Sequence, residues 1–377
     1  MSIEEIVELS RAYGSDPDWV LAGGGNTSFK DDASLYVKAS GFALATIEPH
    51  GFARMDRAAL DRIWTVTYPN EVEARESAAL ADLMAARAEG EDKRPSVETL
   101  MHELIPFPLV VHTHPALVNG VTCSQEGEEA AARIFGDDVL WIPAIEPGYV
   151  LAVAMKRAVE AYRERVGKAP QIILLQNHGL VIAGESVAEI EHLHDTVSRL
   201  IQEHIARTPE LGSVPVDSDA RDGWHSRIEQ AFRSVGEGGY EIVFDASGEV
   251  SRRVASRDAF APVDGAFTPD HIVYAGERPL FIPADTGVDE LATLLEEHRA
   301  ATGALPHIVA VERLGVFALA DTLASADVAL RLFLDEVKIA AYAEGFGGAR
   351  HLDDHLVAFI KGWEVERYRK KTSTGGV

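Results

Sequence analysis

The spacing of apolar and polar positions predicts alternating helices and strands. Residues 2–13 have apolar side chains at a helical period, whereas 109–114 and 170–184 contain short apolar runs typical of buried strands. This alternation predicts an α/β protein in which helices cover a layered sheet. The expected helices cover 2–13, 71–90, 150–165 and 186–206, with two more starting near 95 and 124, and the expected strands lie at 34–39, 42–46, 109–114, 137–145 and in two pieces of 170–184.

One of these patterns occurs twice. The segment APQIILLQNHGLVIAGESVAEIE, residues 169–191, aligns without gaps with LPHIVAVERLGVFALADTLASAD, residues 305–327. Each segment follows a helix of similar length and a strand that contains Ile-Pro. We therefore expect a degenerate second copy at the C-terminus, with Leu314 at the position of His178. Chance similarity between two such pieces is the alternative.

The same patterns suggest three regions. Residues 1–207 form the expected main domain. Residues 208–264 are expected to be a linker and insertion, because Ser, Pro, Asp and Gly dominate 208–222. Residues 265–377 are expected to form the degenerate C-terminal domain without metal-binding histidines.

Composition narrows the class of protein. The 377 residues are 46% hydrophobic and 25% charged, as in globular proteins of one large or two medium domains. A formal net charge of −25 argues against nucleic acid or an anionic membrane as the main partner. Cys123 is the only cysteine, which excludes an intramolecular disulfide and a cysteine-rich metal site. The start MSIEEIVELS lacks the pattern of a signal peptide, and a cytoplasmic enzyme is expected.

Three histidines and one glutamate are the candidate metal ligands. His112 and His114 alternate on one predicted strand, so their imidazoles project to the same face. His178 follows another strand in QNHGL, and Glu98 lies in PSVETL. Three imidazoles and a carboxylate suit zinc or another divalent transition metal. Taken singly, the histidines are equally compatible with core, surface or turn positions, and Glu98 with a helix N-terminus.

The order of these motifs identifies a family resemblance. GGGNTSFK, KASG, PSVE, VVHTHP and NHGLVIAGE follow one another between residues 20 and 206, and in that order the chain resembles the class II aldolase/adducin family. The resemblance is strongest to the aldolase half of bifunctional rhamnulose-1-phosphate aldolase/lactaldehyde dehydrogenase chains. It implies a three-layer fold with a central mixed sheet. It also implies Zn²⁺, or Mn²⁺, Co²⁺ or Fe²⁺, held by His112, His114 and His178 with Glu98.

The resemblance also implies residues for the substrate. Glu98 would be the general base of the condensation reaction, next to the metal. Family aldolases have two serines before this acid, whereas here the second position is Val97. Glu146 and Tyr149 are candidates for the proton donor to the aldehyde, because the place of the family tyrosine is taken by Ala144. The implied phosphate-binding residues are Gly25, Asn26, Thr27, Ser40, Gly41 and Ser96.

The expected function is therefore that of a metal-dependent lyase. It would cleave a phosphorylated ketose, a small-molecule partner, into dihydroxyacetone phosphate and an aldehyde. A sugar-phosphate 4-epimerase or a dehydratase of the same family is the first alternative, because these enzymes share the metal shell. A noncatalytic adducin-like interaction protein is the second, although such modules are expected to lack the metal ligands. A homo-oligomer, dimer or tetramer, is expected from the family.

Overall fold

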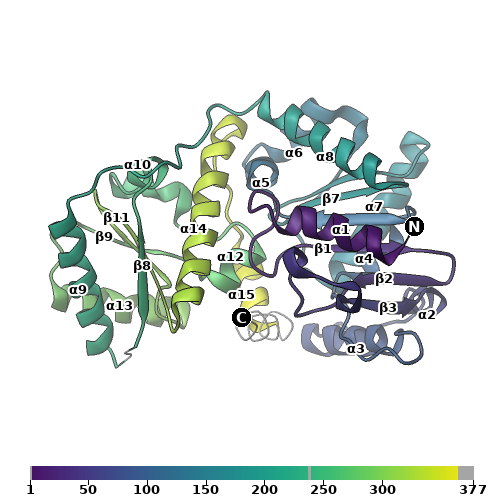
Figure 1. The fold of residues 1–377 in the computed structure, drawn as a ribbon, viewed down its shortest axis with the longest axis horizontal. Coiled ribbons are helices and arrows are strands. Elements are labelled where there is room, and N and C mark those ends of the chain that lie inside the picture. Colours follow the sequence, from purple (N-terminus) through teal and green to yellow (C-terminus); the bar gives the residue numbers. More distant parts are fainter. Residues whose placement is uncertain (1, 237–238, 364–377) are drawn as a thin grey trace. The chain divides into compact units, whose positions relative to one another are not determined.

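The computed structural model describes residues 2–236 and 239–363, which form two compact units (Figure 1). Within these residues, unit 1 comprises 2–122, 127–204 and 363, and unit 2 comprises 123–126 and 205–362. Each unit has its own sheet, which confirms the α/β fold class and a second sheet in the C-terminal part. Among the described residues, no helix is both long and apolar enough to cross a membrane.

Unit 1 is built on a seven-stranded mixed sheet. The strand order is β3-β2-β1-β4-β7-β6-β5, and only the β5–β6 pair is parallel. The predicted strand at 109–114 is therefore central, between β1 and β7. The strands are β1 Asn26–Lys30, β2 Ser34–Lys38, β3 Phe52–Asp56, β4 Leu109–Thr113, β5 Val139–Ile142, β6 Ile172–Leu175 and β7 Gly179–Gly184.

Helices cover both faces of this sheet. Apolar side chains of α2, α3, α4 and α7 bury one face, and α1, α5 and α8 contact β1, β4 and β7 on the other. The result is the expected three-layer arrangement. The helices of unit 1 are α1 Ile3–Gly14, α2 Arg57–Ile63, α3 Val72–Ala85, α4 Thr99–Leu104, α5 Ala116–Thr122, α6 Gly127–Phe135, α7 Tyr149–Val166 and α8 Val187–Gln202, with 3₁₀ turns η1 Leu44–Thr46, η2 Pro49–Gly51 and η3 Gly136–Asp138.

Three local predictions differ from the structure. The helix expected at 71–90 ends at Ala85, and Arg87 forms a β-bridge with Met55. The segment 42–46, expected to be a strand, contains the 3₁₀ turn η1, and the third strand of this part is β3. The helix expected from Pro95 begins only at Thr99, because residues 95 and 96 run beside residues 38 and 39: Ala39 and Pro95 form a β-bridge, and the Ser96 N–H donates to the Lys38 carbonyl at 3.3 Å.

Unit 2 is built on a four-stranded sheet in the order β8-β11-β10-β9. Helices α9 and α13 pack against each other beside a core made with its strands, while α14 contacts β8, β10 and β11 (Figure 1). The elements are α9 Ser218–Ser234, β8 Glu241–Asp245, α10 Gly248–Arg253, α11 Arg257–Phe260, η4 Ala261–Val263, α12 Pro269–Tyr274, β9 Leu280–Ile282, α13 Val288–Thr302, β10 Ile308–Val311, β11 Gly315–Ala320, α14 Leu323–Ala343, η5 Glu344–Phe346 and α15 Asp354–Gly362.

The two units share an element order. In unit 1, β5 is followed by α7 and pairs in parallel with β6, which pairs antiparallel with β7. In unit 2, β9 is followed by α13 and pairs in parallel with β10, which pairs antiparallel with β11. Strand β8 pairs antiparallel with β11 as β4 does with β7, so residues within 208–264 contribute a strand to the second sheet. The turn N–H groups of His178 and Leu314 donate to Leu175 and Val311 carbonyls, both at 3.1 Å.

The register of β8 shows what replaces the other two histidines. In unit 1 His112 lies opposite Val181, and in unit 2 Phe244 lies opposite Phe317, the residue aligned with Val181. Phe244 thus takes the place of His112, and Ala246, two residues later, takes that of His114. With Leu314 at the third position, the second copy has an apolar residue at each of the three places.

Candidate metal centre

The backbone around His178 is adapted to bring the β6–β7 turn against β4. Asn177 has a left-handed conformation, with φ of 54°, and its N–H donates to the Thr122 carbonyl at 3.1 Å. Asparagine adopts this conformation more readily than most residues. A methyl group on Gly179 would lie 2.4 Å from the Thr113 carbonyl oxygen and 2.8 Å from His114 Cδ2. Only glycine therefore lets the turn approach β4 this closely.

The three histidine side chains meet at this point. The Nε2 atom of His112 lies 3.0 Å from His114 Nε2 and 3.3 Å from His178 Nε2. One ligand atom from each of the three residues lies within 4.8 Å of the others, a spacing compatible with binding of one metal ion. The structure thus brings together the three predicted histidines.

His112 is fixed in the form that a metal needs. Its Nδ1 lies 2.9 Å from the Leu180 carbonyl, which can only accept, so Nδ1 carries the proton and Nε2 presents a lone pair. Burial lowers the pKa of His112 well below its ordinary value, which keeps the ring neutral. A neutral imidazole whose second nitrogen is held by a carbonyl is the usual form of a metal-binding histidine.

Glu98 lies beside the three histidines with its two oxygens in different environments. Oε1 is 3.3 Å from His178 Nε2 and 3.6 Å from His112 Nε2, and Oε2 accepts a hydrogen bond from Asn26 Nδ2 at 2.5 Å. Burial alone would raise the pKa of the Glu98 carboxyl, but hydrogen bonds from the His178 ring and the Asn26 amide lower this pKa below its ordinary value. Glu98 is therefore an ionised carboxylate with one oxygen facing the histidines.

Most of the predicted phosphate-binding residues lie near Glu98. Ser96 Oγ accepts from Asn26 Nδ2 at 3.3 Å and from the Glu98 N–H at 3.2 Å. Ser40 Oγ donates to the Pro95 carbonyl at 3.2 Å, next to Gly41, whose φ is 92°. These hydroxyl and amide groups could bind an anion together with backbone N–H groups.

Gly25 and Thr27 flank Asn26 but differ in their contacts. A methyl group on Gly25, which has φ of 64°, would lie 2.8 Å from the His112 carbonyl oxygen, so glycine lets this loop reach β4. The Thr27 side chain projects to the opposite face of β1, where its Oγ1 lies 2.6 Å from Ser10 Oγ on α1. The structure therefore does not bring the Thr27 hydroxyl to the others.

Glu146 and Tyr149 contact α3 and the loop before it. Arg75 donates to Glu146 Oε2 at 2.9 Å, and the rings of Tyr149 and Tyr68 pack edge to face at 4.7 Å. These contacts give no support to a role in the histidine cluster of the same chain. A proton donor to the aldehyde therefore stays a prediction.

Sequence reasoning missed one side chain that joins the site. His102, in α4, lies 2.7 Å from Ser28 Oγ through its Nδ1 and contacts Asn26 Oδ1 through its Nε2. It is fully buried. Glu98 and His102 are spaced i, i+4, so spacing could have indicated that these two residues lie close together, but not that they meet Asn26 and Ser28.

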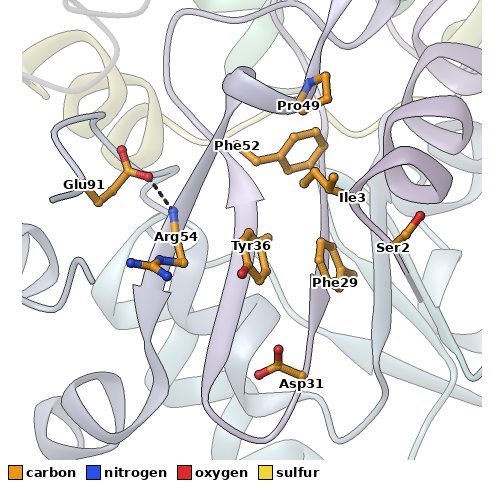
Figure 2. A pocket seen from close by; sticks show the side chains of 9 residues that line it. All are labelled: Ser2, Ile3, Phe29, Asp31, Tyr36, Pro49, Phe52, Arg54 and Glu91. Carbon is orange, nitrogen blue, oxygen red and sulfur yellow. Dashed lines mark hydrogen bonds between the residues drawn. The ribbon is translucent and has the colours of Figure 1, made fainter. Parts of the chain in front are cut away.

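A separate hollow of about 490 Å³ lies on the other face of the same sheet (Figure 2). Its floor includes Phe29 and Tyr36, whose rings stack at 4.5 Å, and Glu91 at its rim accepts a hydrogen bond from the Arg54 N–H. None of the predicted site residues lines it. The lining residues are Ser2, Ile3, Phe29, Asp31, Tyr36, Pro49, Phe52, Arg54 and Glu91.

Comparison with known proteins identifies relatives of unit 1 and of the whole chain. A family model described as the class II aldolase and adducin N-terminal domain matches residues 4–205, a range that contains Glu98 and all three histidines. A curated relative, the uncharacterized oxidoreductase YuxG of Bacillus subtilis strain 168, is 26% identical over 412 residues. The match covers 97% of this chain but 58% of YuxG, so the chain spans less than two thirds of that relative.

Solved structures also resemble part of the chain. The N-terminal class II aldolase domain of a conserved protein from Thermoplasma acidophilum is 30% identical, with a TM-score of 0.46, and the match covers 54% of this chain and 93% of that one. An L-fuculose-1-phosphate aldolase from Thermus thermophilus is 17% identical, with a TM-score of 0.34, over 52% of this chain and 92% of that one.

Proposed function

The chain belongs to the class II aldolase and adducin family, and on that premise we propose that it is a divalent-metal-dependent aldolase. The reaction we propose is cleavage of a phosphorylated ketose into dihydroxyacetone phosphate and an aldehyde. The observation that carries this proposal is the convergence of three histidine Nε2 atoms next to one oxygen of Glu98. An interaction module would have no need to keep this buried and mutually repulsive group of polar atoms together.

The residues present fit a metal ion such as zinc. Three imidazole nitrogens are a common zinc-binding set that leaves a coordination position for substrate, and the carbonyl of Leu180 holds His112 in the required tautomer. Mn²⁺, Co²⁺ and Fe²⁺ also accept imidazole and carboxylate ligands. When bound, the ion would act as a Lewis acid that stabilises negative charge on a substrate ketone oxygen.

We propose that Glu98 moves the proton of the reaction. In the condensation direction Oε1 takes a proton from the carbon next to the ketone, and in cleavage the same oxygen returns it. The low pKa of Glu98 keeps it ready to accept, and Asn26 holds Oε2 so that Oε1 faces the histidines. Whether Glu98 also binds the metal stays a prediction.

The proposed phosphate site lies around Ser96. The hydroxyls of Ser40 and Ser96, the Asn26 amide and backbone N–H groups near Gly25 and Gly41 would hold the phosphate end of the substrate. Val97 supplies no hydroxyl where family aldolases have a second serine. We therefore expect weaker phosphate binding than a two-serine site would give.

The test is a panel of ketose 1-phosphates and 5-phosphates offered to the zinc-loaded protein. L-Rhamnulose 1-phosphate belongs in the panel, because the finer resemblance to rhamnulose-1-phosphate aldolases stays a prediction. From a ketose 1-phosphate we expect dihydroxyacetone phosphate, detected by coupled reduction, and an aldehyde seen by NMR. At saturating zinc, Glu98→Gln should lower kcat by about 10²–10⁴.

Other outcomes of this test favour other functions. An epimer or a dehydrated product in the NMR spectrum would replace the aldolase with a 4-epimerase or a dehydratase that uses the same ligands. Zinc binding without turnover of any phosphorylated substrate would contradict the proposal and favour an interaction role.

We also propose that the protein forms a homo-oligomer. Glu146 and Tyr149 contact α3 rather than the histidines, so any role of theirs in the reaction would be in the site of a neighbouring chain. Light scattering should give a dimer or a tetramer, and a clear monomer would contradict this.

A further inference from the structure

We propose that His102 is a positioning residue that orients Glu98 through the Asn26 amide. This inference rests on the proposed function for the role of Glu98, but the contacts on which it depends do not. His102 is fully buried and lies one helical turn after Glu98, under the strand that carries Asn26.

One face of β1 forms a row of polar contacts to α4. Asn26, Ser28 and Lys30 alternate along the strand and therefore project to the same face. Ser28 and Asn26 contact the two ring nitrogens of His102, and Lys30 Nζ donates to the His102 and Glu103 carbonyls at the end of α4. Polar contacts therefore hold α4, which begins directly after Glu98, to this strand.

The direction of each hydrogen bond follows from the orientation of the Asn26 amide. The Asn26 atom that faces Glu98 Oε2 is Nδ2, and an amide nitrogen can only donate. The other Asn26 amide hydrogen is directed at Ser96 Oγ, so Oδ1 faces His102 Nε2, which must donate. His102 Nδ1 then accepts from the Ser28 hydroxyl at 2.7 Å.

This sequence of donors fixes the Asn26 amide. If the amide turned over, its oxygen would face the Glu98 carboxylate and its NH₂ group would face the His102 N–H, so both contacts would be repulsive. Burial lowers the pKa of His102 to about 3, which keeps the ring neutral with only one N–H. With Asn26 fixed, Oε2 of Glu98 is held and Oε1 faces the histidines.

The arrangement can be tested in the metal-free protein. NMR of ¹⁵N-histidine-labelled protein should show His102 as the neutral Nε2–H tautomer at pH 7. The Nδ1–H tautomer or a protonated ring would overturn the proposal. This measurement needs neither metal nor substrate, so its outcome is independent of the proposed function.

A second experiment compares zinc affinity and activity in two variants of His102. His102→Gln keeps an N–H donor at a similar reach, whereas His102→Leu removes it. We expect His102→Leu to lower both zinc affinity and kcat by about 10–100-fold, with KM little changed. His102→Gln should recover most of both losses. Equal losses in the two variants would overturn the proposal, because they would point to a packing role.

A double-mutant cycle identifies Asn26 as the intermediary. In an Asn26→Ala background, His102→Leu should change zinc affinity less than twofold, because the group it acts through is gone. Additive losses would overturn the proposal. If no substrate is found, zinc affinity in this cycle still decides the question.

Two further variants distinguish the proposed role of His102 from a general loss of stability. Ser28→Ala leaves His102 in place and should give a mixture of tautomers with a loss of zinc affinity of about 3–10-fold. Ser10→Ala removes an equally buried hydroxyl on the opposite face of β1. It should leave zinc affinity unchanged, and a loss as large as that of Ser28→Ala would overturn the proposal.

Discussion

His178 and Leu314 occupy equivalent turns, and the comparison isolates the role of a single imidazole. Both residues make the same backbone hydrogen bond at 3.1 Å, and each follows a residue in a left-handed conformation, Asn177 with φ of 54° and Arg313 with φ of 60°. The turn in unit 2 forms around leucine. The turn in unit 1 therefore does not need a histidine in order to form.

His178→Leu should remove the metal and leave the fold intact. The leucine side chain suits this turn, as unit 2 shows, but supplies no lone pair. We expect elemental analysis to find less than 0.1 zinc per chain, about a tenfold loss or more, with a melting temperature of the metal-free protein close to that of the wild type. Full zinc content in this variant would contradict the three-histidine centre. His192→Leu, at an exposed histidine, is the matched control.

His194 is a buried histidine whose protonation should oppose folding. Its Nδ1 lies 2.9 Å from the Tyr13 hydroxyl, and burial lowers its pKa from 6.5 to about 4. The unfolded chain binds this proton near pH 6.5 and the folded chain only near pH 4. Its contribution to stability is thus complete above pH 6.5 and is lost as the pH falls toward 4, by about 2 kcal/mol between pH 7 and pH 5.

Urea unfolding of His194→Gln measures this contribution. The substitution removes the titrating ring but keeps an amide near Tyr13, so the loss of stability between pH 7 and pH 5 should be smaller than in the wild type by about 2 kcal/mol. His192→Gln, on the exposed side of the same helix, should behave like the wild type. An unchanged pH dependence in His194→Gln would show that the folded protein binds this proton as readily as the unfolded chain does.

At the scale of elements, two glycines allow hairpins to approach a neighbouring strand. A methyl group would lie 2.4 Å from the Thr113 carbonyl oxygen at Gly179, and 2.5 Å from the Asp245 carbonyl oxygen at Gly315. The two positions are equivalent in the aligned segments. Only the first of these hairpins presents a histidine.

Gly179→Ala and Gly315→Ala form a matched pair of tests. Each should destabilise its own unit by about 1–3 kcal/mol, because the backbone must shift to admit a methyl group. Only Gly179→Ala should also lower zinc affinity, since the shift moves His178 away from His114. Isothermal titration with zinc measures the difference, and an equal loss in both variants would contradict this interpretation.

The elements with strong periodicity were predictable, and the short polar ones were not. The run LVVHTH gives β4 correctly, and the turn at 177–179 was expected from Asn and Gly. Strand β1 was missed because NTSFK is largely polar, and its pairing with β2 and β4 and its contacts with α4 are tertiary features that no local pattern reveals. Helix α4 was predicted too early for the same reason, because residues 95 and 96 run beside residues 38 and 39.

The residues of the candidate metal site also differ in how far the sequence could predict them. The histidines could be found from the sequence because alternation on one strand and a turn after another are local features. The face to which Thr27 points depends on which layer α1 covers, and that is a tertiary property. His102 was missed because the partners of its ring lie more than 70 residues away in the chain.

At the scale of the whole molecule, two copies of one element order should bind one metal ion. Phe244, Ala246 and Leu314 lie where unit 1 has its three histidines, so restoring one imidazole cannot complete a second site. Leu314→His should therefore leave the zinc content at about one per chain, as three ligands would require. Two zinc ions per chain would show that other residues of unit 2 supply ligands.

The extent of the second copy was the part of the chain least accessible to sequence. Residues 305–327 aligned with 169–191 because both segments are long and apolar. Strand β8 went unrecognised within 208–264, because its five residues follow a polar stretch and its partner β11 lies about seventy residues later. The residues that replace His112 and His114 became visible only through this pairing.

Arg313 shows how strongly the hairpin of unit 2 determines the backbone of its own turn. An arginine in a left-handed conformation is less stable than asparagine or glycine there, by about 1 kcal/mol, so Arg313→Gly should raise the stability of unit 2 by up to that amount in urea unfolding. The same turn thus forms around asparagine in unit 1 and around arginine in unit 2. Its backbone shape is set by the hairpin and its neighbouring strand, so the side chains of this turn can change without changing the fold.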